Sequence, residues 1–179
     1  MSLYFTEEHE FFRKSFQDFL KKEVVPHIDT WEQTGTIDRF IWEKFGEMGY
    51  FGLATPEAYG GMDLDIFYTI IFIEELQKIN SGGFAAAIWA HEYLAMTHLN
   101  KEANEAQKQK YLVPLAKGKK DGELHIGAFL LSEPEAGSDA TSQQTTAEDK
   151  GDYYLLNGTK NWITNGSSAS VYLVIAQTD

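Results

Sequence analysis

The spacing of the apolar residues changes near residue 120, and this change limits the folds open to the chain. Before it, long segments repeat apolar side chains at three- and four-residue steps, the period of a helix packed on one face. After it, short runs alternate with Gly, Asn and Asp, as in strands joined by turns. The sequence predicts an α+β fold: an all-α helical bundle domain over residues 1–120, then an incomplete antiparallel β domain over residues 121–179.

The negative charge is concentrated in the second part. Residues 121–179 hold nine acidic residues but only two basic ones, Lys150 and Lys160. Because this asymmetry begins where the apolar spacing changes, it supports a domain boundary near residues 119–122.

Five helical segments are expected in the first part. Thr6, followed by two glutamates, is suited to cap the first of them, and Pro26 ends or kinks it. Asp38 and Asp65 are placed to cap the second and third. The run 84–99 is apolar on more than one face and is expected at the centre of the bundle. The other expected segments are residues 40–48, 66–79 and 102–117, with a loop at 51–61.

Short strands are expected in the second part. Asn157-Gly158 is the strongest hairpin signal in the sequence, so the runs on either side of it are expected to pair. Four or five short strands with an open end make a poor independent domain. We therefore expect the chain to be cut inside its β domain. The expected strands are residues 125–131, 143–147, 153–156, 160–164 and 171–176.

The composition excludes several partners and site types. The chain has 15 Lys and Arg against 27 Asp and Glu, a formal net charge of −12, which argues against nucleic acid and anionic membrane surfaces as partners. It contains no cysteine, which excludes disulfides, cysteine zinc sites and thiolate catalysis. Residues 1–10 carry acids where a signal or transit peptide needs basic residues, and no long apolar span follows. A cytoplasmic protein without a membrane anchor is expected.

Residues 130–139 form the first candidate binding segment. Pro134 and Gly137 bend the loop, which leaves the hydroxyls of Ser132 and Ser138 and nearby amides pointing outward. Such groups suit the polar edge of a heterocycle or an acyl carbonyl. The alternative is an ordinary surface turn, in which the same residue types are common.

Residues 157–166 form the second candidate segment. Trp162 and Thr164 are two apart, so on a strand they would face the same side. An indole beside a hydroxyl fits a flat conjugated ligand. The alternative is a tryptophan that belongs to the core.

Other chemical signatures are weak. His91 and His98 are two helical turns apart and the other histidines are scattered, so no metal site is expected. Glu74 and Glu75 are adjacent and diverge around a helix, so they are not a catalytic carboxylate pair. No phosphate-binding glycine motif is present.

Taken together, the two candidate segments resemble the acyl-CoA dehydrogenase family. The typical pattern there is a strand, (T/S)EPxAGSD and then GDxYxLNGxKxWITNG, and residues 129–139 and 151–166 match nearly every position. Residues 56–61 resemble the family's PxxYGG segment, and residues 105–112 resemble its EeQKqkyL helix. The resemblance spans essentially the whole chain, in order.

The resemblance implies three parts: a helical domain, a middle β domain and a C-terminal four-helix bundle. It implies noncovalent FAD and oxidation of fatty or branched acyl-CoA thioesters to trans-2-enoyl-CoA, as in beta-oxidation. In the family a carboxylate removes the pro-R α-proton while a β-hydride passes to flavin N5. That glutamate lies on the C-terminal bundle, which we expect this chain to lack. No catalytic residue is assigned, and the fragment alone is expected to be inactive.

The resemblance also implies roles for single residues. The Ser132 hydroxyl would meet the polar edge of the isoalloxazine, Trp162 would pack against the flavin, and Thr164 would hydrogen-bond near N5. Ser138 would contact the CoA side of the substrate. Many members have Thr where this chain has Ser132, which keeps the hydroxyl and removes a methyl group. The expected cofactor-binding residues are Phe129, Leu131, Ser132, Trp162, Ile163 and Thr164.

The resemblance further implies an electron-transfer flavoprotein as acceptor and a homotetramer or homodimer at full length. A related flavoenzyme, an acyl-CoA oxidase or a flavin monooxygenase, remains an alternative. So does a protein of another class, a cofactor-free helical interaction module whose docking surface is residues 66–99. If the chain is such an interaction module, Trp162→Ala and Thr164→Ala should leave the FAD content of the full-length protein unchanged.

Overall fold

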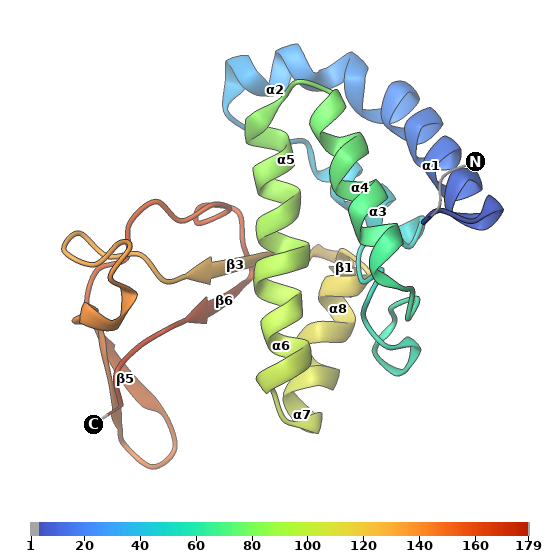
Figure 1. The fold of residues 1–179 in the computed structure, drawn as a ribbon. Coiled ribbons are helices and arrows are strands. Elements are labelled where there is room, and N and C mark those ends of the chain that lie inside the picture. The colour runs from blue at the N-terminus through green and yellow to red at the C-terminus, as the bar shows by residue number, and fades with distance from the viewer. Residues whose placement is uncertain (1–3, 179) are drawn as a thin grey trace.

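Helices form the first part of the molecule and short strand pairs form the second, as expected (Figure 1). The structure is a computed structural model and describes residues 4–178. The α-helices are α1 (Glu7–Phe19), α2 (Ile28–Thr34), α3 (Arg39–Glu47), α4 (Ile66–Lys78), α5 (Gly82–Trp89), α6 (Thr97–Glu102), α7 (Glu105–Gln107) and α8 (Val113–Ala116). They are joined by π-helical segments η1 (Leu20–Val24), η4 (Ala90–Met96) and η5 (Lys108–Leu112), and by 3-10 turns η2 (Val25–His27) and η3 (Glu57–Tyr59). A further 3-10 turn, η6 (Ala140–Ser142), lies between strands β3 and β4.

Two of the three predicted caps are confirmed. The Thr6 hydroxyl accepts a hydrogen bond from the amide of His9 at 3.3 Å, and the Thr6 amide donates to Nδ1 of His9 at 3.0 Å. The Asp65 carboxylate accepts from the amide of Phe67 at 2.8 Å. Asp38 does precede α3, but its side chain makes no capping hydrogen bond.

The chain between Pro26 and Asp38 contains a helix that the sequence analysis missed. Pro26 lies in the 3-10 turn η2, and α2 follows it directly. The middle residue of α2 is Trp31, whose ring stacks on that of Phe84 with centroids 5.5 Å apart. Tertiary packing of this one large side chain stabilises a helix too short to be recognised by periodicity.

The predicted central helix is confirmed as a single rod formed by α5, η4 and α6. It lies between the other helices and the strands β3 and β6 (Figure 1). The last predicted helix starts later than expected, at Glu105, because Asn104 and Gln107 form a capping box there. Glu102, expected at the start of that helix, instead ends the central rod.

Buried aromatic rings hold the helical part together. Phe16 of α1 is fully buried and stacks on Phe72 of α4, with ring centroids 4.6 Å apart. Tyr50 and Phe45 contact the same Phe16 ring at 4.7 and 6.1 Å. Backbones also approach closely at Gly46 of α3, where a Cβ would lie 2.1 Å from the carbonyl oxygen of Lys117.

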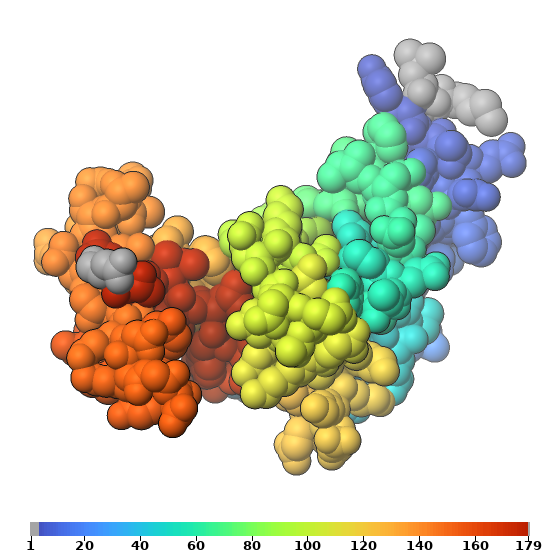
Figure 2. Space-filling view, turned by 90° about the horizontal axis from the view of Figure 1, so that it is seen from below, coloured from blue at the N-terminus to red at the C-terminus, as the bar shows by residue number. Residues whose placement is uncertain are grey.

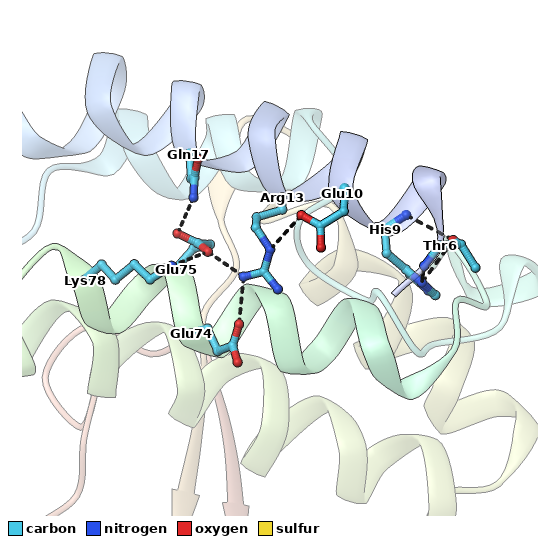
Figure 3. A network of polar contacts seen from close by, with 8 residues as sticks. All are labelled: Thr6, His9, Glu10, Arg13, Gln17, Glu74, Glu75 and Lys78. Carbon is cyan, nitrogen blue, oxygen red and sulfur yellow. Dashed lines mark hydrogen bonds and ion pairs between the residues drawn. The ribbon is translucent and has the colours of Figure 1, made fainter. Parts of the chain in front are cut away.

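A polar network also joins α1 to α4 (Figure 3). Arg13 donates to Glu74 at 2.7 Å and to Glu75 at 2.6 Å, and Gln17 and Lys78 also donate to Glu75, at 2.9 and 2.7 Å. Burial opposes ionisation of Glu75, yet bonds from Lys78, Gln17 and Arg13 hold its pKa below the ordinary value. The two glutamates thus hold helices together.

Within residues 4–178 the strands form three pairs, and a bridge between Thr146 and Gln177 links β4 to the segment after β6. β4 (Thr146–Asp149) and β5 (Tyr154–Asn157) are antiparallel, in agreement with the predicted antiparallel domain. β1 (Lys119–Lys120) and β2 (Glu123–Leu124) are also antiparallel, although neither strand was predicted. β3 (Gly127–Leu130) and β6 (Val171–Val174) are parallel, which differs from the antiparallel prediction. Because the 40 residues between β3 and β6 form a crossover with its own hairpin, these two strands can run in the same direction.

Two strand predictions are wrong. The hairpin joins β4 to β5 through residues 150–153, and Asn157-Gly158 is not its turn. Residues 160–164 form no strand. Gly158 instead passes close to Thr145, where a Cβ would lie 2.3 Å from the hydroxyl oxygen, and the residues after it turn toward the end of β3.

A hollow separates the β4–β5 hairpin from α6 and α7 (Figure 2). It forms a groove of about 630 Å³, lined by residues that include His98, Tyr111, Leu156 and Leu173. Among residues 4–178, no helix is both long enough and apolar enough to cross a bilayer.

Candidate functional site

The structure brings the two candidate segments together. The amide of Asn161 donates to the carbonyl of Ser132 at 2.9 Å. The ammonium of Lys160 donates to the carbonyl of Leu131 at 2.9 Å. Residues 29 positions apart in the sequence are therefore joined directly after β3, where the sequence analysis expected a ligand.

A buried ion pair stabilises this junction. Lys160 lies 2.7 Å from the Glu133 carboxylate, and the two side chains are 7% and 4% exposed. The Glu133 carboxylate also accepts the amides of Gln144 and Thr145, at 2.5 and 3.0 Å. The ammonium and the carboxylate thus bind each other and also form hydrogen bonds with backbone groups. A buried charge pair is tolerated when its hydrogen-bonding groups are paired in this way.

These contacts change the acidity of Glu133. The hydrogen bond from the Gln144 amide and then the one from Lys160 lower the pKa of Glu133 from 4.5 to about 2. Sequence reasoning missed both residues of the pair. Their signal was available, because each stands inside one of the two candidate segments.

We predict that acid weakens this junction over a defined range. The Glu133 carboxylate takes up a proton near pH 4.5 in the unfolded chain but only near pH 2 in the folded chain. The stability that this group contributes is therefore fully present above pH 4.5 and falls as the pH drops toward 2. Hydrogen exchange at the Gln144 and Thr145 amides measures it. Glu133→Gln should flatten the dependence between pH 4.5 and 2, and an unchanged dependence would contradict the prediction.

Trp162 is the most exposed of the large apolar side chains described, at 91% of its full area. Its backbone has φ +60, which a bulky residue adopts only at a cost of roughly 1–3 kcal/mol. The predictions that Trp162 lies on a strand or in the core are both wrong. The bonds of Lys160 and Asn161 hold the backbone beside Trp162, and the indole itself is exposed.

The other residues of the second segment lie in two environments. Ile163 is half-buried and lines a small cavity with Leu130 and Lys160. Thr164 is exposed at the start of a turn, 164–168, and lines a cavity of about 500 Å³ with Phe84 and Ala87 of α5. The prediction that the side chains of Trp162 and Thr164 face the same side assumed a strand over these residues, and the structure has no strand there.

The first segment follows β3. Phe129 is half-buried on β3, and its ring stacks on His98 of α6 with centroids 4.5 Å apart. Leu131 and Ser132 are also half-buried and come directly after the strand. Ser138 is exposed on the following loop. The structure thus places Leu131 and Ser132 beside the Trp162 segment, with Ser138 farther along the loop.

The junction is attached to the helical part through Asn165. Its side-chain Nδ2 donates to the carbonyl of Ala87 at 2.8 Å and to that of Gly127 at 3.3 Å. Gly127 is the first residue of β3. The turn that carries Thr164 is therefore fixed to both α5 and β3.

These groups fit the flavin that the resemblance implies. An open indole face supplies a stacking surface, and the hydroxyls of Ser132 and Thr164 supply polar contacts. The half-buried Leu131 supplies an apolar wall. A flat ring system with a polar edge has the chemistry that fits this set of side chains.

Comparison with known proteins agrees with the motifs. The family model for the N-terminal domain of acyl-CoA dehydrogenases matches residues 6–119, and the model for the middle domain matches residues 128–179. The chain is 39% identical to a short-chain-specific acyl-CoA dehydrogenase of Clostridium acetobutylicum over its whole length and 46% of that protein. The chain spans less than half the length of the curated relatives that it matches.

Solved structures are similar over the same range. An acyl-CoA dehydrogenase of Bacillus anthracis complexed with FAD has a TM-score of 0.88 and 36% identity, covering 97% of this chain and 29% of that one. A chain from a structure described as the electron transferring flavoprotein of Acidaminococcus fermentans has a TM-score of 0.90 and 41% identity, covering 100% of this chain and 46% of that one.

Proposed function

This chain belongs to the acyl-CoA dehydrogenase family, and on that premise we propose that the full-length protein is an FAD-dependent enzyme that oxidises acyl-CoA thioesters to trans-2-enoyl-CoA. The observation that carries the proposal is the junction of the two candidate segments, held by Lys160 and Glu133 beside an open indole. The substrates proposed are fatty or branched acyl-CoA thioesters, as in beta-oxidation.

The residues proposed to bind FAD lie in the two candidate segments, which the junction joins, and on the end of β3. Ser132 would donate to the polar edge of the ring system, Trp162 would stack on it, and Thr164 would add a hydroxyl contact. Phe129, Leu131 and Ile163 would supply apolar surface. Phe129, Leu131 and Ile163 are half-buried, and the Lys160–Glu133 ion pair fixes the backbone of the two segments, which supports the assignment of these apolar residues.

When bound, FAD supplies the acceptor for the hydride that leaves the substrate β-carbon. This chain's part is to bind and orient, because a fixed geometry lowers the barrier of a transfer between two bound groups. Ser138 is proposed to contact the CoA side of the substrate. The α-proton goes to a carboxylate base that the resemblance places in the family's C-terminal bundle, so we assign no residue of this chain to that step.

Further proposals concern partners and organisation. The electrons are proposed to pass to an electron-transfer flavoprotein, and the likeness to a chain in a structure described by that name supports this. We also propose a homotetramer or homodimer, a cytoplasmic location, and a boundary between the helical and β domains at residues 119–122. The strands β1 and β2, of two residues each, pair at that boundary.

Anaerobic reduction of the flavin tests the function. The full-length protein loaded with FAD should lose its visible flavin absorption when butyryl- or octanoyl-CoA is added, and failure with every acyl-CoA would refute the proposal that it is a dehydrogenase.

Trp162→Ala and Thr164→Ala should lower the FAD content, since each removes a proposed contact. An unchanged FAD content in both variants would favour the interaction module. Oxygen outcompeting an electron-transfer flavoprotein as acceptor would favour an oxidase or monooxygenase.

A further inference from the structure

We propose that His91 is a positioning residue for the flavin site, because its neutral imidazole fixes the start of β3 against the helical part. The inference rests on the proposed function for its link to FAD. It concerns a side chain that contacts neither of the two candidate segments and that no step of the proposed reaction uses.

Both ring nitrogens of His91 bind backbone groups. Nδ1 accepts the amide of Gly127 at 3.0 Å, and Nε2 lies 3.1 Å from the carbonyl of Leu115. A carbonyl can only accept and an amide can only donate, so the ring must carry its proton on Nε2 and none on Nδ1. This single tautomer connects η4, α8 and β3.

The surroundings of the ring keep it neutral. His91 is fully buried, and its ring lies 5.7 Å from that of Trp42 on α3 and 4.2 Å from that of Phe51. Burial lowers the pKa of His91 to about 3. The groups that face the ring from neighbouring elements are these two aromatic side chains and the backbones of Leu115 and Gly127. Glu92, next in η4, binds elsewhere.

Gly127 is held from both sides. Its amide donates to His91, and its carbonyl accepts from Asn165 of the turn that carries Thr164. A Cβ on Gly127 would lie 2.5 Å from the Cβ of Ala95 in η4, so only glycine lets the strand approach this closely. From this fixed point the strand runs directly to Phe129, Leu131 and Ser132.

The neighbouring Glu92 provides an internal comparison. It is also buried in η4, and its carboxylate accepts the amides of Gly52 and Leu53 at 2.7 and 3.2 Å. Burial raises the pKa of Glu92 to about 7. Two adjacent buried polar side chains of one π-helical segment thus hold different elements. Of these two side chains, it is His91 that holds the strand leading to the proposed flavin site.

The test compares three variants in the full-length protein. His91→Phe keeps a ring but removes both hydrogen bonds, and it should raise the Kd for FAD by about tenfold or more and shift the visible circular dichroism of bound flavin. His91→Asn keeps an acceptor near the Nδ1 position and should recover part of the affinity. Glu92→Gln should change the Kd by less than about twofold, because it leaves β3 untouched.

A second measurement separates this inference from the proposed function. If the wild-type protein binds no FAD, the proposed function fails. Amide exchange at Gly127 still tests the positioning role, and it should accelerate by about tenfold or more in His91→Phe but not in Glu92→Gln. An unchanged Gly127 exchange rate in His91→Phe, or a Kd and flavin spectrum like those of the wild type, would overturn the inference. Should His91→Phe fail to fold, His91→Asn is judged by the same two readouts.

Discussion

Replacing Lys160 by methionine (Lys160→Met) is expected to abolish measurable FAD binding by the full-length protein. Methionine fills a similar volume but leaves the buried Glu133 carboxylate without its cation, and it releases the carbonyl of Leu131. Removing one partner of a buried pair costs far more than the pair contributes, because the remaining charge stays out of water. The loss of affinity should be at least about a hundredfold, measured by titration of the apoprotein with FAD.

The chain offers a matched control for this experiment. Lys150 also pairs with a glutamate, Glu148, but at the surface, where the two side chains are 36% and 61% exposed. Surface pairs contribute only about 0–1 kcal/mol, so Lys150→Met should leave FAD binding unchanged. Equal losses in the two lysine variants would show that charge in general, and not the buried pair, supports the site.

A double substitution separates loss of the pair from the cost of an unpaired charge. Glu133→Gln added to Lys160→Met removes the unpaired carboxylate while keeping an oxygen that accepts an amide. Thermal unfolding of the double variant should therefore occur above that of Lys160→Met and below that of the wild type. A double variant less stable than Lys160→Met would contradict this account of the junction.

The sequence was most informative where the information was local. Thr6 and Asp65 are helix caps in the structure, and the apolar run 84–99 is the central rod, because a cap or a periodic stripe is defined by residues a few positions apart. The strands at residues 127–130 and 171–174 were also recognisable from short apolar runs. The two candidate segments were identified from their residue types alone.

The failures share a physical cause, which is contact between residues far apart in sequence. Asn157-Gly158 has the composition of a hairpin turn, but Lys160 finds its partner 27 residues earlier, and the chain follows that contact instead of forming a strand. His91 reaches Gly127 across 36 residues. Its position on an apolar helix face gave no sign of a backbone partner. Buried polar side chains of this kind become interpretable only once both partners are placed.

Phe16→Ala is expected to give the largest loss of stability in the helical part. Phe16 is fully buried between Phe72 and Tyr50, with ring centroids 4.6 and 4.7 Å away, so truncation leaves a cavity among rigid rings. Such substitutions cost about 3–5 kcal/mol of unfolding free energy, and aromatic contacts of this geometry add to the loss. Urea unfolding of the full-length protein measures the change, with an unaltered dependence on denaturant.

Phe11, on the same helix, is the matched control because it is 77% exposed. Phe11 lies to one side of the apolar stripe at residues 12, 16 and 19, so Phe11→Ala should change the unfolding free energy by no more than about 0.5 kcal/mol. Phe16→Leu should fall between the two, since it restores most of the lost volume but not the ring contacts. Equal costs for Phe16→Ala and Phe11→Ala would mean that the helix packs through a different face. The aromatic core that supports the central rod, and through His91 the start of β3, would then be wrongly placed.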